Sequence, residues 1–188
     1  MDQQERPSDE MLINKAVKGD KSSFEALYCR YVDPIYRYIF FRVNHPLQTE
    51  DMTEEVFTRA LEALPTLRTG QYTFRNWLYR TAHNLVVDYF RKHKPVQVPS
   101  DQLRWVKSAD EQPENIVDHN LKVERVAEAI RKLDETGKQV LILRFMEGLS
   151  HQDISSILGK SQAACRAIQY RALKTLRALL AEKEAPHG

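Results

Sequence analysis

Residues 74–92 read FRNWLYRTAHNLVVDYFRK, and this stretch decides the fold. Its apolar side chains recur three and four residues apart, which is the spacing of one face of an α-helix. That face consists of Phe74, Trp77, Leu78, Thr81, Ala82, Leu85 and Tyr89. The opposite face carries Arg75, Asn76, Arg80, His83, Asn84 and Arg91. The pattern predicts an amphipathic helix with an apolar core face and a basic exposed face.

Helical spacing recurs on both sides of this stretch. Ser22 and Glu25 form a capping-box pattern ahead of an apolar run, and Pro34 is typical of the first turn of a new helix. A second stripe, which ends before Pro65, consists of Met52, Val56, Ala60, Leu61 and Leu64. A third consists of Val123, Val126, Ile130, Leu133, Val140 and Leu143. Because no stretch alternates like a strand between hairpin turns, the sequence predicts an all-α protein.

Helical periodicity stops over residues 94–118, which contain Pro95, Pro99 and Pro113 among acidic residues. The chain of 188 residues is long enough for two small domains of roughly 70 to 100 residues. We therefore expect two small helical domains, residues 1–93 and 121–188, joined by an irregular linker over residues 94–120. Trp105 is one of the few large apolar residues of this linker, and it could dock on another surface.

Charge is unevenly distributed, although the net charge is only +2. Residues 50–62 carry five acidic side chains against Arg59 alone. Residues 68–94 and 160–183 each carry six Lys or Arg side chains against a single acidic one. One acidic stretch and two basic stretches suggest three different partner surfaces.

The C-terminal basic stretch has the spacing of a helix-turn-helix. Ser150 with Asp153 forms an N-cap pair for a short helix that ends at Gly159, and Ser161 can cap the next helix. The inward residues of that second helix would be Cys165, Ile168 and Ala172, and its exposed residues Gln162, Ala163, Arg166 and Tyr170. Such a helix fits the major groove of DNA, although an ordinary αα-hairpin has a similar period.

Together these stretches resemble the sigma-70 family of bacterial RNA polymerase sigma factors. LDETGKQVLILRFMEGLSHQDISSILGKSQAACRAIQYRALKTLR (133–177) resembles region 4, EDMTEEVFTRALEAL (50–64) resembles region 2.2, and residues 74–92 resemble regions 2.3 and 2.4. Two such regions on a short linker are the arrangement of the extracytoplasmic-function (ECF) class. The chain departs from the family pattern at Ile168 and Gln169, where an arginine and an aliphatic residue are usual, and at Cys165, where valine is common.

The resemblance implies a factor that binds core RNA polymerase and directs promoter-specific initiation by reading the minus-35 and minus-10 elements. The polymerase-binding residues would be Asp51, Glu54, Glu55 and Phe57, with Phe57 as an apolar anchor on the clamp helices. An anti-sigma factor is a further expected partner. The linker would thread into the polymerase near the RNA path.

The resemblance also assigns two DNA-binding sets. The minus-10 set would be Leu67, Tyr72, Phe74, Arg75, Trp77, Arg80, Asn84 and Arg91. Within it, the loop from Leu67 to Phe74 would hold a flipped base with help from Asn84, and the position of Trp77 on the apolar stripe favours core packing. The minus-35 set would be Ser161, Gln162, Ala163, Arg166, Tyr170, Arg171 and Lys174. Arg166 is the best candidate for a guanine edge, whereas Arg171 and Lys174 suit phosphates.

Other functional classes find little support in the sequence. No apolar run of about 18 residues exists and the polar, acidic N-terminus lacks a secretory signal, so we expect no membrane insertion and a cytoplasmic location. Cys29 and Cys165 are too far apart in sequence for a disulfide framework, and we expect two buried, reduced thiols. The six histidines lack metal-ligand spacing, and no phosphate loop or nucleophile pair exists. We expect no enzyme activity, no metal and no cofactor.

Two alternatives remain open at this point. A two-domain repressor or activator would use residues 1–93 for sensing or dimerisation and would bind duplex DNA alone, but it has no need of an acidic helix followed by a basic aromatic one. A helical enzyme acting on nucleic acid would need a cluster of acids or a metal set, which the sequence does not offer.

Overall fold

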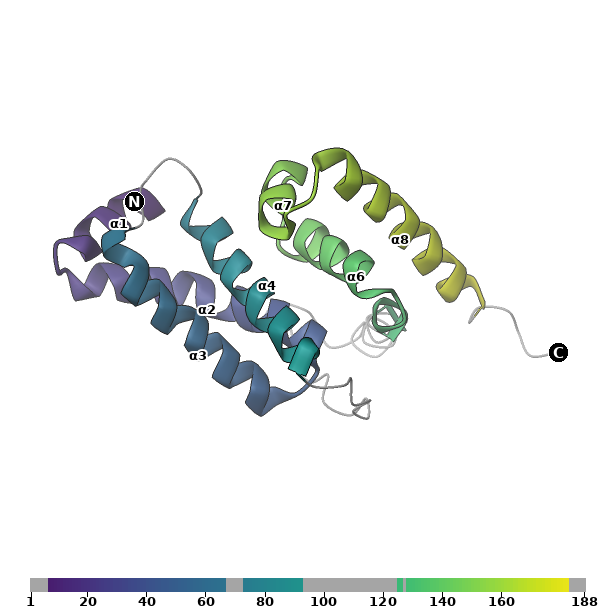
Figure 1. Cartoon of the computed structure of the whole chain (residues 1–188), viewed down its shortest axis with the longest axis horizontal. Helices are drawn as coiled ribbons and strands as arrows, with labels where there is room; N and C mark the ends of the chain where they lie inside the picture. The colour runs from purple at the N-terminus through teal and green to yellow at the C-terminus, as the bar shows by residue number, and fades with distance from the viewer. Residues whose placement is uncertain (1–6, 67–72, 93–124, 127, 183–188) are drawn as a thin grey trace, which may run out of the picture. The chain divides into compact units, whose positions relative to one another are not determined.

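A computed structural model describes residues 7–66, 73–92, 125–126 and 128–182. Every regular element among these residues is helical, which confirms the all-α prediction. The chain divides into two compact units, the first of which contains α1 to α4 and the second α6, η4 and α8 (Figure 1). The whole of the expected linker, residues 94–120, lies outside the described residues. No helix among those described is long and apolar enough to cross a membrane.

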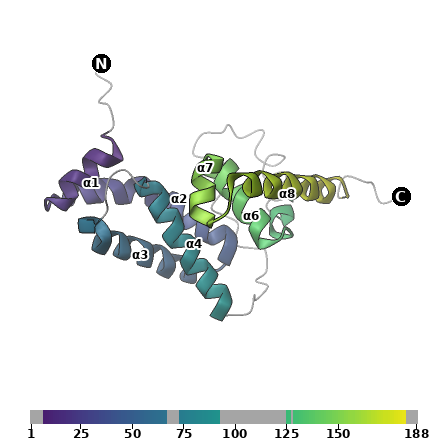
Figure 2. The same ribbon diagram turned by 45° about the horizontal axis from the view of Figure 1, so that its top comes forward.

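The first unit is built around α2 (Lys21–Val43), which packs against three other helices. These are α1 (Asp9–Val17), α3 (Pro46–Ala63) and α4 (Phe74–Lys92), and the 3-10 turn η1 (Leu64–Thr66) follows α3. Figures 1 and 2 show α3 and α4 lying along α2. The fully buried core of this unit consists of Leu27, Ile35, Tyr38, Ile39, Val56, Ala60, Leu78, Tyr79, Ala82 and Val86. These residues come from three helices, so the acidic and basic stretches of the sequence share one core.

The start of α2 differs from the prediction. Asp20, not Ser22, is the N-cap, so the expected pairing of Ser22 with Glu25 is wrong. The Asp20 carboxylate accepts hydrogen bonds from the Ser22 backbone N–H at 3.1 Å and from the hydroxyls of Ser22 and Ser23 at 2.7 Å. These bonds lower the pKa of Asp20. A carboxylate with three donors caps the helix better than a hydroxyl with one.

Pro34 lies inside α2, so the expected restart of the chain there is also wrong. Proline cannot donate to the carbonyl four residues earlier and costs about 3 kcal/mol in a helix interior. The helix continues because residues before and after Pro34 are fully buried in the same core, Leu27 before it and Ile35 and Tyr38 after it. Tertiary packing here outweighs the local preference.

The buried arc of α4 is wider than its predicted apolar stripe. Asn76, expected on the exposed face, is 6% exposed, and Tyr79, which falls outside the stripe, is 1% exposed. The reason is that α4 packs against both α2 and α3, so two sides of the helix are covered. The rings of Tyr79 and Tyr38 meet edge to face with centroids 5.5 Å apart.

The second part of the chain contains α6 (Glu135–Leu141), the π-helical η4 (Ile142–Met146), α7 (His151–Leu158) and α8 (Gln162–Glu182). Buried Leu133, Leu141 and Ala172 pack together beneath Leu173, Leu176 and Leu179 of α8. Residues 125–126 and 128–131 are also helical. Val126, which was expected to be buried, is 38% exposed, and Ala129 is buried instead. Val123 lies outside the described residues.

Gly137 allows α6 to approach α8 closely. A Cβ at this position would lie 3.0 Å from the Ala172 Cβ and 2.8 Å from Asp134 Oδ1. Asp134 is the N-cap of α6, and its carboxylate accepts from the Gly137 N–H at 3.3 Å. The close contact between α6 and α8 therefore depends on glycine at position 137, because a Cβ there would clash.

Candidate nucleic-acid interface and acidic surface

Helix α3 exposes a continuous row of carboxylates, which we call the acidic stripe: Glu50, Asp51, Glu54, Glu55 and Glu62. Helical spacing places these residues on one side of α3, opposite the buried Met52, Val56 and Ala60. Glu55 forms an exposed ion pair with Arg59, at 2.7 Å. Arg59 is the single basic side chain of this stretch. Because exposed pairs are weak, the stripe keeps its negative field toward solvent.

The apolar residues of α3 are arranged differently from the prediction. Phe57 is 4% exposed and packs edge-on against Tyr28 with ring centroids 4.7 Å apart, so it is not the exposed anchor that was expected. Leu61, expected in the core, is 54% exposed, and Leu47 is 68% exposed. The helix turns about 100° per residue, and its actual rotation buries Phe57 beside Val56. Leu47 therefore lies before the first carboxylate of the acidic stripe, and Leu61 lies beside the last one.

Helix α4 presents four of the predicted minus-10 residues on one side, which we call the basic face: Trp77, Arg80, Asn84 and Arg91. Arg80, Asn84 and Arg91 are exposed, and Trp77 is half-buried at the edge of the core. Arg91 shares an ion pair with Asp88 at 3.1 Å, with both side chains more than half exposed. The basic face thus combines cations, an amide and a flat aromatic edge, which suit the phosphates and unstacked bases of a single strand.

The other predicted minus-10 residues are placed elsewhere. Phe74 is 3% exposed and stacks edge-on against Tyr31, so its side chain is part of the core. Arg75 is half-buried. It lies two residues before Trp77, and this separates the two side chains by about 200° around the helix axis. It therefore faces away from the basic face. Leu67 and Tyr72 lie outside the described residues.

A buried tyrosine of α2, Tyr38, contacts α4, the helix that carries the basic face. The Tyr38 hydroxyl accepts a hydrogen bond from Arg42 Nη1 at 3.1 Å and lies 3.5 Å from His83 Nδ1 on α4. The Arg42 guanidinium also lies over the Tyr38 ring, 5.6 Å from its centroid. Tyr38 is fully buried, so this contact links α2 and α4 inside the unit and fixes the rotation of α4.

The helix-turn-helix has the caps that the sequence predicts. The Ser150 N–H donates to Asp153 Oδ2 at 3.2 Å, and the Asp153 N–H donates to Ser150 Oγ at 3.1 Å, which is a reciprocal capping box. Ser161 Oγ accepts from the Ala164 N–H at 3.1 Å at the start of α8. Gly159, with φ of 62°, makes the turn between the helices.

All seven predicted minus-35 residues are exposed, the capping Ser161 directly before α8 and the others on α8: Ser161, Gln162, Ala163, Arg166, Tyr170, Arg171 and Lys174. Cys165 and Ala172 are buried as expected, and Ile168 is half-buried. Gln169, which departs from the family pattern, makes a hydrogen bond across the motif, because its Oε1 lies 2.8 Å from His151 Nε2 on α7. Since Oε1 can only accept, His151 donates, and the pair ties the two helices together.

The two cysteines have different environments, and the expectation that both are buried is wrong. Cys165 is fully buried and its pKa is raised by burial. Cys29 is exposed because it lies about 200° around α2 from the buried Leu27. Among the described residues, no group of three or more His, Cys, Asp or Glu side chains could hold a metal ion.

Comparison with known families gives two matches along the chain. The family model described as Sigma-70 region 2 matches residues 27–96, and the one described as Sigma-70, region 4 matches residues 123–176. RNA polymerase sigma factor YlaC of Bacillus subtilis is 30% identical over 159 residues, which cover 84% of this chain and 91% of YlaC. The chain belongs to the sigma-70 family of RNA polymerase sigma factors. The region 2 match contains the acidic stripe and the basic face, and the region 4 match contains α7 and most of α8.

Two ECF RNA polymerase sigma factors also resemble this sigma factor, and they place the chain in the ECF class. BldN of Streptomyces coelicolor is 34% identical over 170 residues, 90% of this chain, which spans 64% of the length of BldN. SigX of Bacillus subtilis is 31% identical over 163 residues, covering 84% of this chain and 83% of SigX. Helix α1 begins before the region 2 match and lies wholly outside it.

Two solved structures share the fold of this sigma factor. CnrH, in complex with the cytosolic domain of CnrY, aligns with a TM-score of 0.70 at 24% identity and covers 93% of this chain and 97% of CnrH. RpoE of Bartonella quintana, in complex with the anti-sigma factor NepR, aligns with a TM-score of 0.68 at 16% identity, covering 84% and 96%. At these identities the likeness concerns the fold.

Proposed function

We propose that this sigma factor binds core RNA polymerase through the acidic stripe and reads promoter DNA with the basic face and with α8. The observation that carries the proposal is the pairing of opposite surfaces within one unit. An acidic helix and a basic, aromatic-edged helix pack against each other and expose their charged sides, and a capped helix-turn-helix follows in the same chain. A duplex-binding repressor needs the last of these features alone.

At the polymerase contact, charge and apolar area have separate roles. The acidic stripe sets orientation and encounter rate with a basic partner, while apolar contact at its ends supplies affinity. Leu47 and Leu61 take the anchoring role first assigned to Phe57, since they are exposed and Phe57 is not. Asp51, Glu54 and Glu55 remain the central acidic contacts.

At the minus-10 element, the basic face captures the unstacked strand. Arg80 and Arg91 neutralise phosphates, Asn84 offers donors and an acceptor to a base edge, and the half-buried Trp77 supplies a flat edge. Participation of Leu67 and Tyr72 in holding a flipped base stays a prediction. Phe74 and Arg75 are left out of the contact set because of their positions in the fold.

At the minus-35 element, the first three turns of α8 enter the major groove. Arg166 reads a guanine edge, Gln162 and Tyr170 contact neighbouring base edges, and Arg171 and Lys174 hold phosphates. Bonds to phosphates fix the register of the helix, whereas the contact from Arg166 discriminates between bases. Residues 1–93 and 121–188 would act as the two DNA-binding domains and residues 94–120 as their linker.

The chain itself carries out no chemical step in this proposal. It belongs to a family of specificity factors, and the bound polymerase joins the nucleotides. A cytoplasmic location follows from this role, since polymerase and promoter are found there. An anti-sigma factor is proposed as a regulatory partner, because CnrH and RpoE are both complexed with other proteins, CnrY and the anti-sigma factor NepR.

Run-off transcription with bacterial core polymerase on a library of promoters tests the proposal. Wild type should initiate at a subset of promoters, and the charge reversal Glu54→Lys/Glu55→Lys should abolish this. The matched control is Glu10→Lys/Glu25→Lys, which makes the same charge change at exposed positions of α1 and α2 and should retain activity. If no promoter responds, and the isolated chain instead binds a duplex tightly as a dimer, the repressor alternative is correct.

A further inference from the structure

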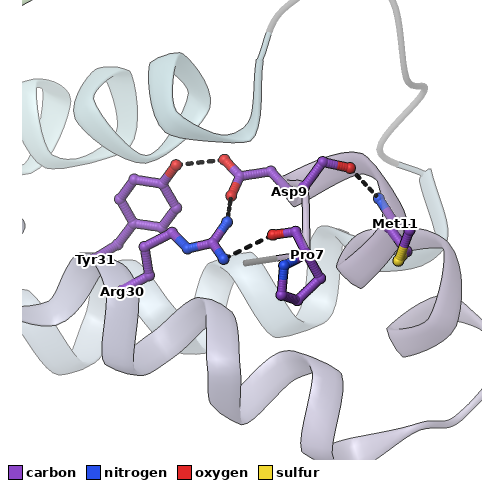
Figure 3. Close-up of polar contacts among 6 residues, drawn as sticks. Pro7, Asp9, Met11, Arg30 and Tyr31 are labelled. Carbon is purple, nitrogen blue, oxygen red and sulfur yellow. Dashed lines mark hydrogen bonds and ion pairs between the residues drawn. The ribbon is translucent and has the colours of Figure 1, made fainter. Parts of the chain in front are cut away.

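A polar cluster joins α1 to α2 at one end of the first unit (Figure 3). The Asp9 carboxylate of α1 accepts from Arg30 through one oxygen and from the Tyr31 hydroxyl through the other. Arg30 also donates to the backbone carbonyl of Pro7 at 2.8 Å. The Asp9 and Arg30 side chains are 24% and 29% exposed, so the cluster is more sheltered than a surface ion pair. Asp9 thus fixes two residues of α2 at once.

The cluster extends to the first turn of α4. The ring of Tyr31 packs edge-on against Phe74, the first residue of α4, with centroids 5.9 Å apart. Burial and the Asp9 carboxylate raise the pKa of Tyr31, while the positive charge of the neighbouring Arg75 opposes the rise. The Tyr31 hydroxyl therefore stays protonated and donates to Asp9. Asp9, Tyr31 and Phe74 form a chain of contacts from α1 to the beginning of α4.

None of these residues belongs to the basic face. Phe74 is buried and Arg75 faces away from it, yet both immediately precede Trp77 and Arg80 on the same rigid helix. α1 packs in addition against η1, the turn that ends the preceding helical segment. The N-terminal end of α4 is held by this chain of contacts, whereas Arg91 lies more than four turns further along the helix.

We propose that Asp9 and Tyr31 are positioning residues for promoter opening, which hold the first turns of α4 so that Trp77 and Arg80 meet the unstacked strand. The inference rests on the proposed function of the basic face. A contact residue is effective when its supporting residues hold it within about 0.5 Å of its working geometry. Asp9 lies before the residues matched by the Sigma-70 region 2 model, which begin at residue 27, and Tyr31 lies within them.

Holoenzyme reconstituted from the full chain and core polymerase tests the inference on a promoter that wild type opens. Opening is followed by the fluorescence of 2-aminopurine in the minus-10 element. Asp9→Asn removes the charge, and Tyr31→Phe removes the hydroxyl but keeps the ring against Phe74. Each should slow opening by about fivefold, the effect of one lost hydrogen bond, with unchanged affinity for core polymerase. Glu10→Gln, an exposed neighbour on α1, should open like wild type.

A double-mutant cycle separates positioning from general destabilisation. Asp9→Asn should add less to the defect of Arg80→Ala than it adds to wild type, because one of the two contacts that it positions is already gone. The effects of Asp9→Asn and Arg91→Ala should instead multiply. Wild-type opening by Asp9→Asn and Tyr31→Phe, or equal multiplication with both arginine variants, would overturn the inference. If Arg80→Ala itself opens normally, the proposed role of the basic face fails, and the inference with it.

Discussion

Replacing Phe57 or Leu61 by alanine should separate stability from partner binding on α3. Phe57 is 4% exposed and pairs with the Tyr28 ring, whereas Leu61 is 54% exposed beside the acidic stripe. Truncating a buried phenylalanine costs about 3–5 kcal/mol, a range that includes the packing lost around the cavity. Truncating a half-exposed leucine changes the free energy of unfolding by about 0.5 kcal/mol or less. The two variants should therefore differ by at least about 2.5 kcal/mol in stability.

Denaturant unfolding in a Trp105→Phe background measures this difference. Trp77 is then the sole tryptophan and reports on the first unit. Affinity for core polymerase is measured on the same proteins under conditions in which each is folded. Leu61→Ala should weaken that affinity without moving the unfolding midpoint, and Phe57→Ala should do the reverse. A stable Phe57→Ala protein that no longer binds polymerase would refute the placement of Phe57 in the core.

Three further outcomes follow from local geometry. Gly137→Ala should destabilise the second unit by about 1–3 kcal/mol in thermal unfolding, because the new Cβ would lie 3.0 Å from the Ala172 Cβ and 2.8 Å from Asp134 Oδ1, and Ala172→Gly should relieve only the first of these contacts. In duplex-binding titrations by the holoenzyme, Arg166→Ala should relax the preference at one base pair, costing about 1–3 kcal/mol, whereas Arg171→Ala should weaken all duplexes alike and reduce the salt slope by about 1. Because its folded-state pKa is lowered, Asp20 stabilises the fold above its ordinary pKa of 3.8, and this contribution is lost as pH falls through the lower folded value. Asp20→Asn should flatten the acid side of the stability profile.

The elements that sequence alone predicts best are those specified by neighbouring residues. The period of residues 74–92 and the caps at Ser150 and Ser161 are local signals, and the structure confirms them. Pro34 is a local signal as well, but α2 continues through it because the residues on either side are packed in the core. Local preference amounts to a few kcal/mol at most, so it yields wherever a buried face continues through it.

The rotation of a helix is harder to predict than its existence. Phe57 and Leu61 are both apolar and four residues apart, and either could belong to a stripe that contains Val56 and Ala60. Which one is buried depends on the direction from which α2 and α4 approach α3, and that information is not in α3 itself. Contacts between residues far apart in sequence, such as Asp9 with Tyr31 and His151 with Gln169, leave no periodic signal at all.

The layout of charge in the first unit gives a physical reason for dependence on polymerase. Packed helices have axes about 8–10 Å apart, which is close to the Debye length of about 8 Å at physiological ionic strength. Because α3 and α4 pack against each other, the acidic stripe and the basic face lie on adjoining helices, and the negative field of the stripe opposes DNA phosphates that approach the basic face. A basic partner bound to the stripe neutralises that field. If polymerase binds through α3 as proposed, its binding should strengthen DNA binding through α4, and this coupling requires no change in the conformation of either helix.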